Sequence, residues 1–138
     1  MTDSVIIPQL IEHEGLRLKP YKCPTGRLTI GVGHNLSDNG ITEEEAMCLL
    51  RNDIARCVKE LQDILDGMFW VLPEIVQRVL VDMIFNLGAT RFVKFKKMIA
   101  AIKAEDFHLA ATEMKASLWY TQVGKRGKTL HGMMSLAV

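Results

Sequence analysis

Residues 18–34 are the one stretch of this 138-residue chain that departs from a helical pattern. Elsewhere apolar residues recur every three or four positions, which is typical of amphipathic helices. Within the stretch, Arg27–His34 alternates like a strand and follows the turn-forming residues Pro24–Gly26. We therefore predict a β-hairpin, in which glycines at every second position near its end permit close approach of another segment or of a ligand.

The segment before the hairpin predicts a short helix over residues 5–14. Pro8 suits the first turn of such a helix, and Gly15 is a common helix stop. Its apolar face would be formed by Ile6, Ile7, Leu10 and Ile11.

After the hairpin, residues 35–40 are expected to form a loop, and a long helix follows. Thr42 and Glu45 have the spacing of a capping box, and Gly67 is the expected end. A helix of that length could bridge two lobes. Its expected buried stripe contains Ala46, Leu50, Ile54, Cys57, Val58, Leu61 and Leu65.

A central helix is predicted from Pro73 to its stop at Gly88, because apolar residues occupy more than one of its faces. Further helices are expected around residues 91–104, 106–117 and 127–137. One small hairpin beside five or more helices predicts an α+β fold that is mostly α, with the strands and helices segregated.

Composition limits the partners that can be expected. Residues 1–90 hold 8 basic and 13 acidic side chains, whereas residues 91–138 hold 9 basic and 3 acidic ones. Such a basic face is either simply solvated or attracted to a polyanion, nucleic acid or a bacterial envelope. No aromatic residues interleave with these lysines, so we expect no nucleic-acid partner. No apolar run approaches the ~20 residues that span a bilayer, and we expect neither membrane insertion nor a cleaved secretory signal.

The cysteines and histidines do not predict a disulfide framework or a metal site. There are three cysteines, and an odd number without a secretory signal argues against disulfides. Cys48 and Cys57 lie in the long helix and are expected in or near the core, whereas Cys23 lies in the turn-rich stretch. The four histidines are scattered, and none has metal-ligand spacing beside another ligand. We expect neither a metal nor a cofactor.

Glu14 is the candidate for acid chemistry, because it occupies the last turn of the first helix. The carbonyl end of a helix carries partial negative charge and disfavours another negative charge there. A carboxylate so placed holds its proton longer, as a general acid requires. Taken alone, a glutamate at a helix end is more often an ordinary surface residue.

Two hairpin residues could supply the other half of such a reaction. A turn at residues 24–26 places Cys23 and Thr29 on opposing strands, near enough to act together. A threonine hydroxyl can hold water, and an ionised cysteine can accept that water's proton. Cleavage of a glycosidic bond with inversion needs an acid on one side of the bond and a group that holds water on the other.

The chain resembles the phage-type lysozyme family. The mark of that family is a Glu, eight residues, an Asp or Cys, five residues and a Thr, which Glu14, Cys23 and Thr29 match. The resemblance covers nearly the whole chain. Its segments are 14–21, 29–34, 40–42, 82–88 and 117–122.

The resemblance implies one lysozyme-like domain over residues 1–138, with two lobes, a cleft between them and a long connecting helix. The small β-containing lobe would be residues 15–41. The helical lobe would be residues 68–138, with residues 1–14 packing near the cleft. The implied activity is hydrolysis of the β-1,4 bond between N-acetylmuramic acid and N-acetylglucosamine in bacterial peptidoglycan, which leads to lysis of the host cell.

The resemblance also implies a role for each candidate residue. Glu14 matches the catalytic acid, and Thr29 matches the threonine that positions water. Cys23 occupies a position that is often Asp, which makes its role less secure than that of a carboxylate. The matches with supporting roles are His34, which buttresses the site; Phe85 and Asn86, which line the cleft; and Arg126, which pairs with the catalytic glutamate.

Two further implications concern the lobe and the life cycle. The link from His34 to Thr42 is short for this family, so the third strand and the helix after it should be missing or reduced. The enzyme would be a monomer that waits in the host bacterial cytoplasm until a holin opens the membrane, and it would then act on the cell wall.

Three other functions remain open from the residues alone. Glu14 acting as acid and then base would make a lytic transglycosylase, whose product carries a 1,6-anhydro ring. Cys23 as nucleophile with His34 as base would make a cysteine hydrolase of the peptide stems, although such thiols usually lie at a helix N-terminus. A cell-wall binding module or a lysozyme that no longer cuts is the third.

Overall fold

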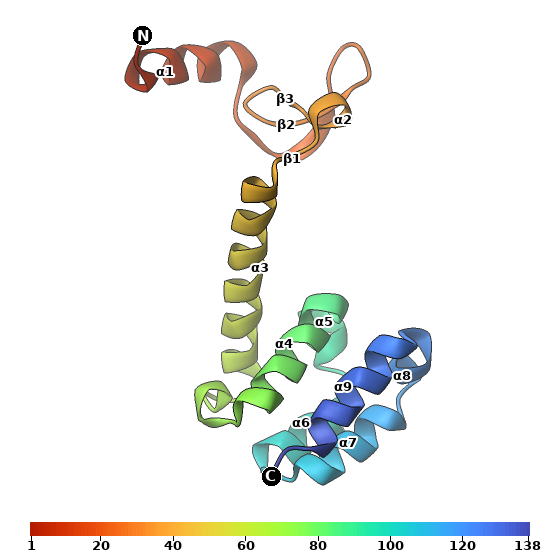
Figure 1. Cartoon of the computed structure of the whole chain (residues 1–138). Coiled ribbons are helices and arrows are strands. Elements are labelled where there is room, and N and C mark those ends of the chain that lie inside the picture. The colour runs from red at the N-terminus through yellow and green to blue at the C-terminus, as the bar shows by residue number, and fades with distance from the viewer. The chain divides into compact units, whose positions relative to one another are not determined.

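The computed structural model describes all 138 residues, which divide into two compact units, Met1–Cys48 and Leu49–Val138. Nine α-helices and one 3-10 helix accompany a single three-stranded antiparallel sheet (Figure 1). The expected mostly helical α+β fold is therefore confirmed. None of the helices combines the length and the apolar character that crossing a membrane requires. The lobe boundaries implied by the resemblance, with residues 1–14 near a cleft, stay predictions.

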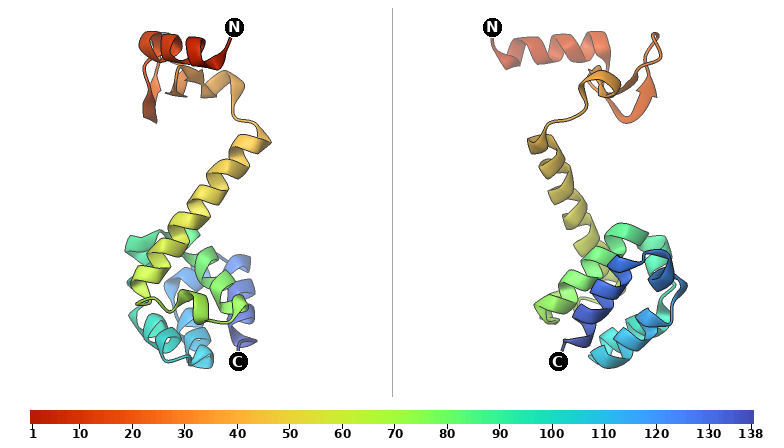
Figure 2. Two further views of the ribbon diagram at one scale, coloured as in Figure 1. Left: turned by 90° about the vertical axis from the view of Figure 1, so that its left-hand side faces the viewer. Right: turned by 45° about the vertical axis from the view of Figure 1, so that its right-hand side comes forward.

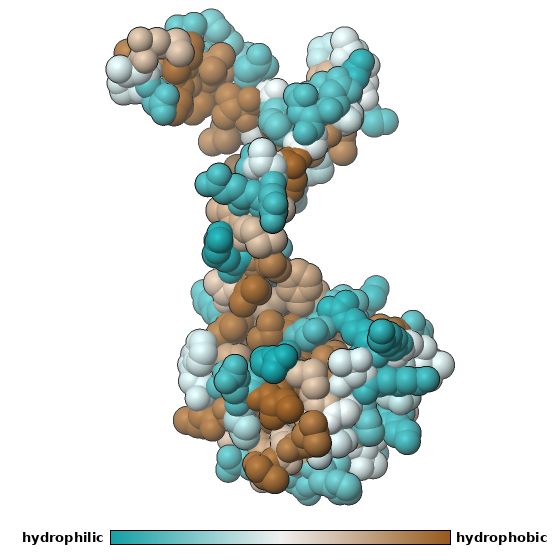
Figure 3. Space-filling view, viewed as in Figure 1, coloured by the Kyte–Doolittle hydropathy of each residue, from teal (hydrophilic) through white to brown (hydrophobic).

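Helix α1 (Asp3–Glu14) begins two residues earlier than expected, because the carbonyl of Thr2 accepts hydrogen bonds from the N–H groups of Val5 and Ile6. Pro8 therefore lies inside the helix, and the expectation that it occupies the first turn is wrong. The predicted stop is confirmed: Gly15 has a φ of 78° and donates its N–H to Ile11. Helix α1 has no buried residue, and its apolar side chains are visible at the surface (Figure 3).

The predicted hairpin is formed by β1 (Arg17–Lys22) and β2 (Leu28–Gly31), which pair antiparallel. A third strand of only two residues, β3 (His34–Asn35), pairs with β2, so the lobe keeps a shortened version of that strand. The segment expected as a loop contains one helical turn, α2 (Leu36–Asn39). The Asn35 side chain caps this turn by accepting a hydrogen bond from the Asp38 N–H, a contact that the pattern of apolar residues does not reveal.

Helix α3 (Glu43–Ile64) starts with the predicted capping box. The Glu45 N–H donates to Thr42 Oγ1 at 3.1 Å, and the Thr42 N–H donates to Glu45 Oε1 at 2.8 Å. The helix ends at Ile64, three residues before the expected stop, and Asp66 and Gly67 then turn with positive φ.

The long helix is buried only near its C-terminal end. Of the expected stripe, Cys57, Leu61 and Leu65 belong to the core of the second unit. Cys48 is exposed, so its expected place in or near the core is wrong. The reason is that the core contacts only the last turns of α3, and a sequence pattern does not say how far along a helix its partner extends.

The second unit packs short helices around α4 (Glu74–Leu87), which carries five buried residues and is central, as expected (Figure 2). The 3-10 helix η1 (Phe69–Val71) precedes α4 in the chain. The helices that follow α4 are α5 (Ala89–Phe92), α6 (Lys96–Lys103), α7 (Phe107–Lys115), α8 (Leu118–Gln122) and α9 (Lys125–Ser135). The single helix expected at 91–104 is two helices, because the chain turns at Val93–Phe95 with the Phe95 N–H bonded to Phe92.

Two glycines of α9 provide a matched test of this packing. A β-carbon at Gly127 would lie 2.8 Å from the backbone oxygen of Tyr120, whereas one at Gly132 would meet nothing within 4 Å. We predict that Gly127→Ala lowers the free energy of unfolding by about 1–3 kcal/mol through overpacking. Gly132→Ala should raise it by about 0.5–1 kcal/mol through helix propensity. Urea denaturation measures both, and equal effects would contradict the close contact.

Candidate functional site

Glu14, at the end of α1, lies against the turn that joins β2 to β3. A β-carbon added at Gly33 would be 2.7 Å from Glu14 Oε2 and 2.9 Å from Glu14 Cδ, which is closer than real β-carbons approach. The carboxyl group therefore occupies space that only a glycine leaves open. Gly15, which turns the chain at the end of α1, leads it directly into β1 of the same sheet.

Cys23 and Thr29 lie near each other on the hairpin, as predicted. The Cys23 N–H donates to the Arg27 carbonyl at 2.9 Å, and the Cys23 carbonyl accepts from the Gly26 N–H at 2.8 Å, which closes a tight turn. Thr29 pairs with Tyr21, two residues before Cys23, so that Cys23 and Thr29 are diagonal neighbours on one face. Thr29 is only 4% exposed and is the one buried polar residue of the chain.

The hydroxyl of Thr29 has a fixed hydrogen-bonding direction. It donates to the Arg27 carbonyl at 3.0 Å. Because a hydroxyl has one hydrogen and two lone pairs, this bond leaves the Thr29 oxygen as an acceptor. The residue can therefore receive a hydrogen bond from a water molecule.

The thiol of Cys23 is unusually acidic. Its pKa is lowered to about 7, chiefly by the hydrogen bond with the Thr25 hydroxyl. The Sγ and Oγ1 atoms are 3.0 Å apart. Backbone groups of Arg27 and Thr25 lower the pKa further, whereas burial opposes the shift. A large fraction of this thiol is thus ionised near neutral pH, and an ionised thiol can accept a proton.

His34 connects the sheet by a hydrogen bond to the link that leads into α3. Its Nε2 atom lies 2.6 Å from the carbonyl oxygen of Gly40, in the link that precedes the capping box. The Cys23 thiol is hydrogen-bonded to Thr25 and the His34 imidazole to Gly40, and no hydrogen bond joins the thiol to the imidazole. This arrangement argues against the cysteine hydrolase, which needs a hydrogen-bonded thiol and base.

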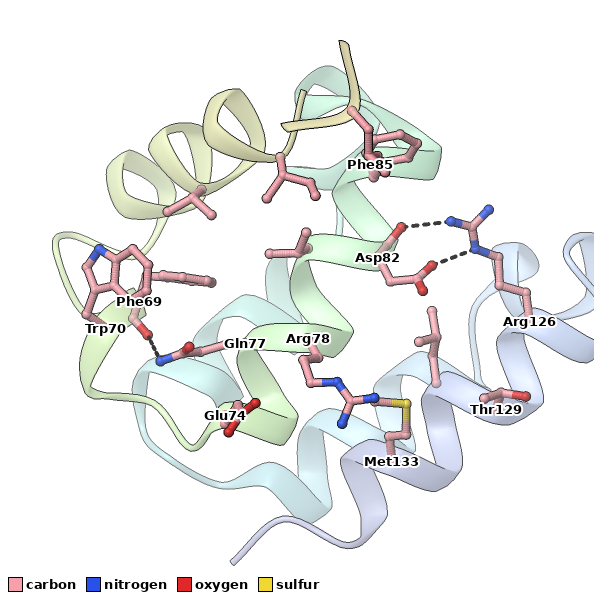
Figure 4. A pocket seen from close by; sticks show the side chains of 15 residues that line it. Phe69, Trp70, Glu74, Gln77, Arg78, Asp82, Phe85, Arg126, Thr129 and Met133 are labelled. Atoms are coloured by element: carbon pink, nitrogen blue, oxygen red, sulfur yellow. Dashed lines mark hydrogen bonds and ion pairs between the residues drawn. The ribbon is translucent and has the colours of Figure 1, made fainter. Parts of the chain in front are cut away.

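The remaining predicted residues belong to the second unit. A hollow of about 690 Å³ lies between α3, η1, α4 and α9, and Phe85 and Arg126 line it (Figure 4). Arg126 Nε donates to Asp82 Oδ1 at 2.6 Å, and its Nη2 donates to the Asp82 carbonyl at 3.3 Å. Asn86 accepts a hydrogen bond from Trp119 Nε1 at 3.1 Å. The expected pairing of Arg126 with the glutamate stays a prediction.

Three contributors to these sites were not found from the sequence. Thr25 was assigned only a turn, although it is the main hydrogen-bond partner of the thiol. Asp82 holds Arg126 across 44 positions of sequence, a distance over which no local pattern gives a signal. Gly33 had a partial signal, because alternating glycines predict a close approach without saying of what. No group of three or more His, Cys, Asp or Glu side chains is arranged to hold a metal ion.

The chain is similar in sequence to known lysozymes and endolysins. The family model described as phage lysozyme matches residues 11–135. The chain is 29% identical to the probable T4-type lysozyme 2 of Dictyostelium discoideum, with 82% of this chain and 83% of that protein aligned. It is 34% identical to the endolysin of Acyrthosiphon pisum secondary endosymbiont phage 1 over 73% of this chain and 68% of that protein. A SAR-endolysin of Bacteriophage PS119 is 28% identical over 85% of this chain and 69% of that protein.

The family model spans most of the chain, and the chain belongs to the phage lysozyme family. It is a glycoside hydrolase of the lysozyme class, an enzyme that lyses peptidoglycan.

The acidity of Cys23 can be measured directly. We predict that its alkylation by iodoacetamide follows an ionisation with a midpoint near pH 7, and that Thr25→Val moves this midpoint upward by removing the main hydrogen bond. The experiment needs a Cys48→Ser background, because Cys48 is exposed, whereas the buried Cys57 should react slowly. A midpoint at ~8.5, the ordinary thiol value, would contradict the assignment.

Proposed function

We propose that the protein is an endolysin that hydrolyses the β-1,4 bond between N-acetylmuramic acid and N-acetylglucosamine. The observation that carries the proposal lies within the first unit. The sheet whose β2–β3 turn receives the Glu14 carboxyl also carries Cys23 and Thr29 side by side. Family membership and the similarity to an endolysin support the choice of substrate.

In the proposed reaction, Glu14 donates its proton to the oxygen of the glycosidic bond as the bond from that oxygen to the anomeric carbon breaks. A water molecule attacks the anomeric carbon from the opposite face. Thr29 accepts a hydrogen bond from this water, since its own hydrogen is committed to Arg27. The Cys23 thiolate takes the proton that the water loses. Solvent then restores the proton of Glu14 and removes the one on Cys23.

The same roles favour hydrolysis over transglycosylation. A transglycosylase closes a 1,6-anhydro ring with the sugar's own hydroxyl and needs no bound water. Thr29 can accept a hydrogen bond from water, and Cys23 next to it can accept the water's proton, which favours water as the nucleophile. The proposed product therefore carries a free reducing end.

The supporting residues take secondary roles in the proposal. His34 keeps the sheet attached to the start of α3 through Gly40. Phe85, Asn86 and Arg126 contribute to glycan binding. Trp119 holds Asn86 by a hydrogen bond, and Asp82 holds Arg126 by an ion pair. As the family resemblance implies, the enzyme would act as a monomer and reach the wall from the host cytoplasm after a holin opens the membrane.

Replacing the acid is the first test of this function. Glu14→Gln keeps the size of the side chain but removes its proton, and general acid catalysis contributes typically 10²–10⁴-fold. We predict a loss of at least that size in the rate of peptidoglycan cleavage, with the thermal unfolding temperature unchanged because Glu14 is exposed. Glu12→Gln, on the same exposed turn, is the matched control and should remain fully active.

Mass spectrometry of the wild-type digest completes this test. Fragments with free reducing ends are expected. Predominantly 1,6-anhydro products would assign the enzyme to the transglycosylases, and near-normal cleavage by Glu14→Gln would remove the proposal altogether.

The pH dependence tests the role of Cys23. If the thiolate accepts the water's proton, wild-type activity should decline as pH falls below about 7, the pKa of that thiol. Cys23→Asp should stay active, and its activity should decline only at a lower pH than that of the wild type, because an aspartate is ionised above ~4. Cys23→Ala should lose most of its activity. A folded but inactive Cys23→Asp, together with a covalent adduct on the wild-type thiol, would instead favour a cysteine nucleophile.

A further inference from the structure

We propose that Gly33 is a positioning residue for Glu14: the missing side chain of this glycine leaves the space that the carboxyl group occupies. The inference rests on the proposed function of Glu14 as the acid. Gly33 takes no part in the chemistry itself. Its effect comes from having no side chain, which leaves room for the Glu14 carboxyl group.

The contact involves the whole outer part of the Glu14 side chain. A β-carbon at Gly33 would lie 2.7 Å from Oε2, 2.9 Å from Cδ and 3.0 Å from Cγ of that residue. Three consecutive atoms therefore follow the surface of the turn. Carbon atoms in ordinary contact are about 3.5–4.0 Å apart, so an alanine could not be accommodated without a shift of roughly an ångström.

Glu14 is the partner that would move. The clash at Gly33 is with the far end of a flexible side chain and not with backbone. Glu14 is exposed and has no side-chain hydrogen bond or ion pair with another residue, so nothing else holds its carboxyl group in place. A substitution at Gly33 would thus cost the fold little, but it would displace the proton donor.

The positive φ of Gly33 must be separated from this effect. Gly33 has a φ of 63°, in the left-handed region, where a residue with a β-carbon is strained. Any substitution at Gly33 therefore also lowers the stability of the fold. The last residue of β2, Gly31, provides the control. Gly31 has a φ of 70°, but a β-carbon at Gly31 would meet nothing within 4 Å. The two glycines share the backbone strain, and only one of them contacts Glu14.

The experiment compares Gly33→Ala with Gly31→Ala. Both should lower the thermal unfolding temperature by a similar amount. Gly33→Ala alone should lower kcat, on the order of 10²-fold, because a misplacement of about 1 Å in a reacting group can cost that much. KM for soluble glycan fragments should stay the same. Gly33→Asn and Gly31→Asn repeat the comparison with a residue that tolerates positive φ, in case the alanine variants fold poorly.

A double-mutant cycle shows whether the effect passes through Glu14. In a Glu14→Gln background, Gly33→Ala should cause no further loss of the residual activity, since the group it displaces no longer acts. Equal kcat values for the Gly33 and Gly31 variants, a rise in KM alone, or an additive loss in the cycle would each overturn the inference. If Glu14→Gln itself is active, it is the proposed function that fails.

Discussion

The β-hairpin turn at residues 23–27 is the constraint on which the proposed chemistry depends. Two backbone hydrogen bonds close it, from the Cys23 N–H to Arg27 and from the Gly26 N–H to Cys23. They set the register that pairs Thr29 with Tyr21 and so bring Thr29 diagonally beside the thiol. A slip of one residue would turn Thr29 to the other face of the sheet and would separate the two groups. The relative position of Cys23 and Thr29 is therefore set by the backbone.

The same turn also makes the thiol suitable as a proton acceptor. A cysteine at its ordinary pKa is mostly protonated at neutral pH and accepts a proton poorly. Here the hydroxyl of Thr25 and backbone groups of Thr25 and Arg27 stabilise the thiolate and bring its pKa to about 7. This physical reason explains how a cysteine can occupy a position that is often an aspartate. The substitution has a consequence, because the group titrates within the physiological range instead of well below it.

Prediction from sequence succeeded where local physics decides the outcome. The stop at Gly15, the capping box of Thr42 and Glu45 and the turn at 24–26 depend on residues within a few positions of each other. It failed where the decision is made at a distance. Cys48 has helical spacing and apolar neighbours, but the core of the second unit contacts only the end of α3. Pro8 lies inside a helix because the chain already turns at Thr2, although a first-turn position was the better local choice.

The sequence by itself determined the kind of protein. The spacing of Glu14, Cys23 and Thr29 around one turn is readable because side-chain chemistry and hairpin geometry repeat over short distances, and the family follows from the whole pattern. Only the tertiary structure decided which residues that are distant in the sequence contact each other. The carboxyl of Glu14 meets Gly33 across two strands, and Arg126 meets Asp82 across two helices. Such contacts depend on how the strands and helices pack in three dimensions. No local sequence pattern predicts them, because the residues are far apart in the chain.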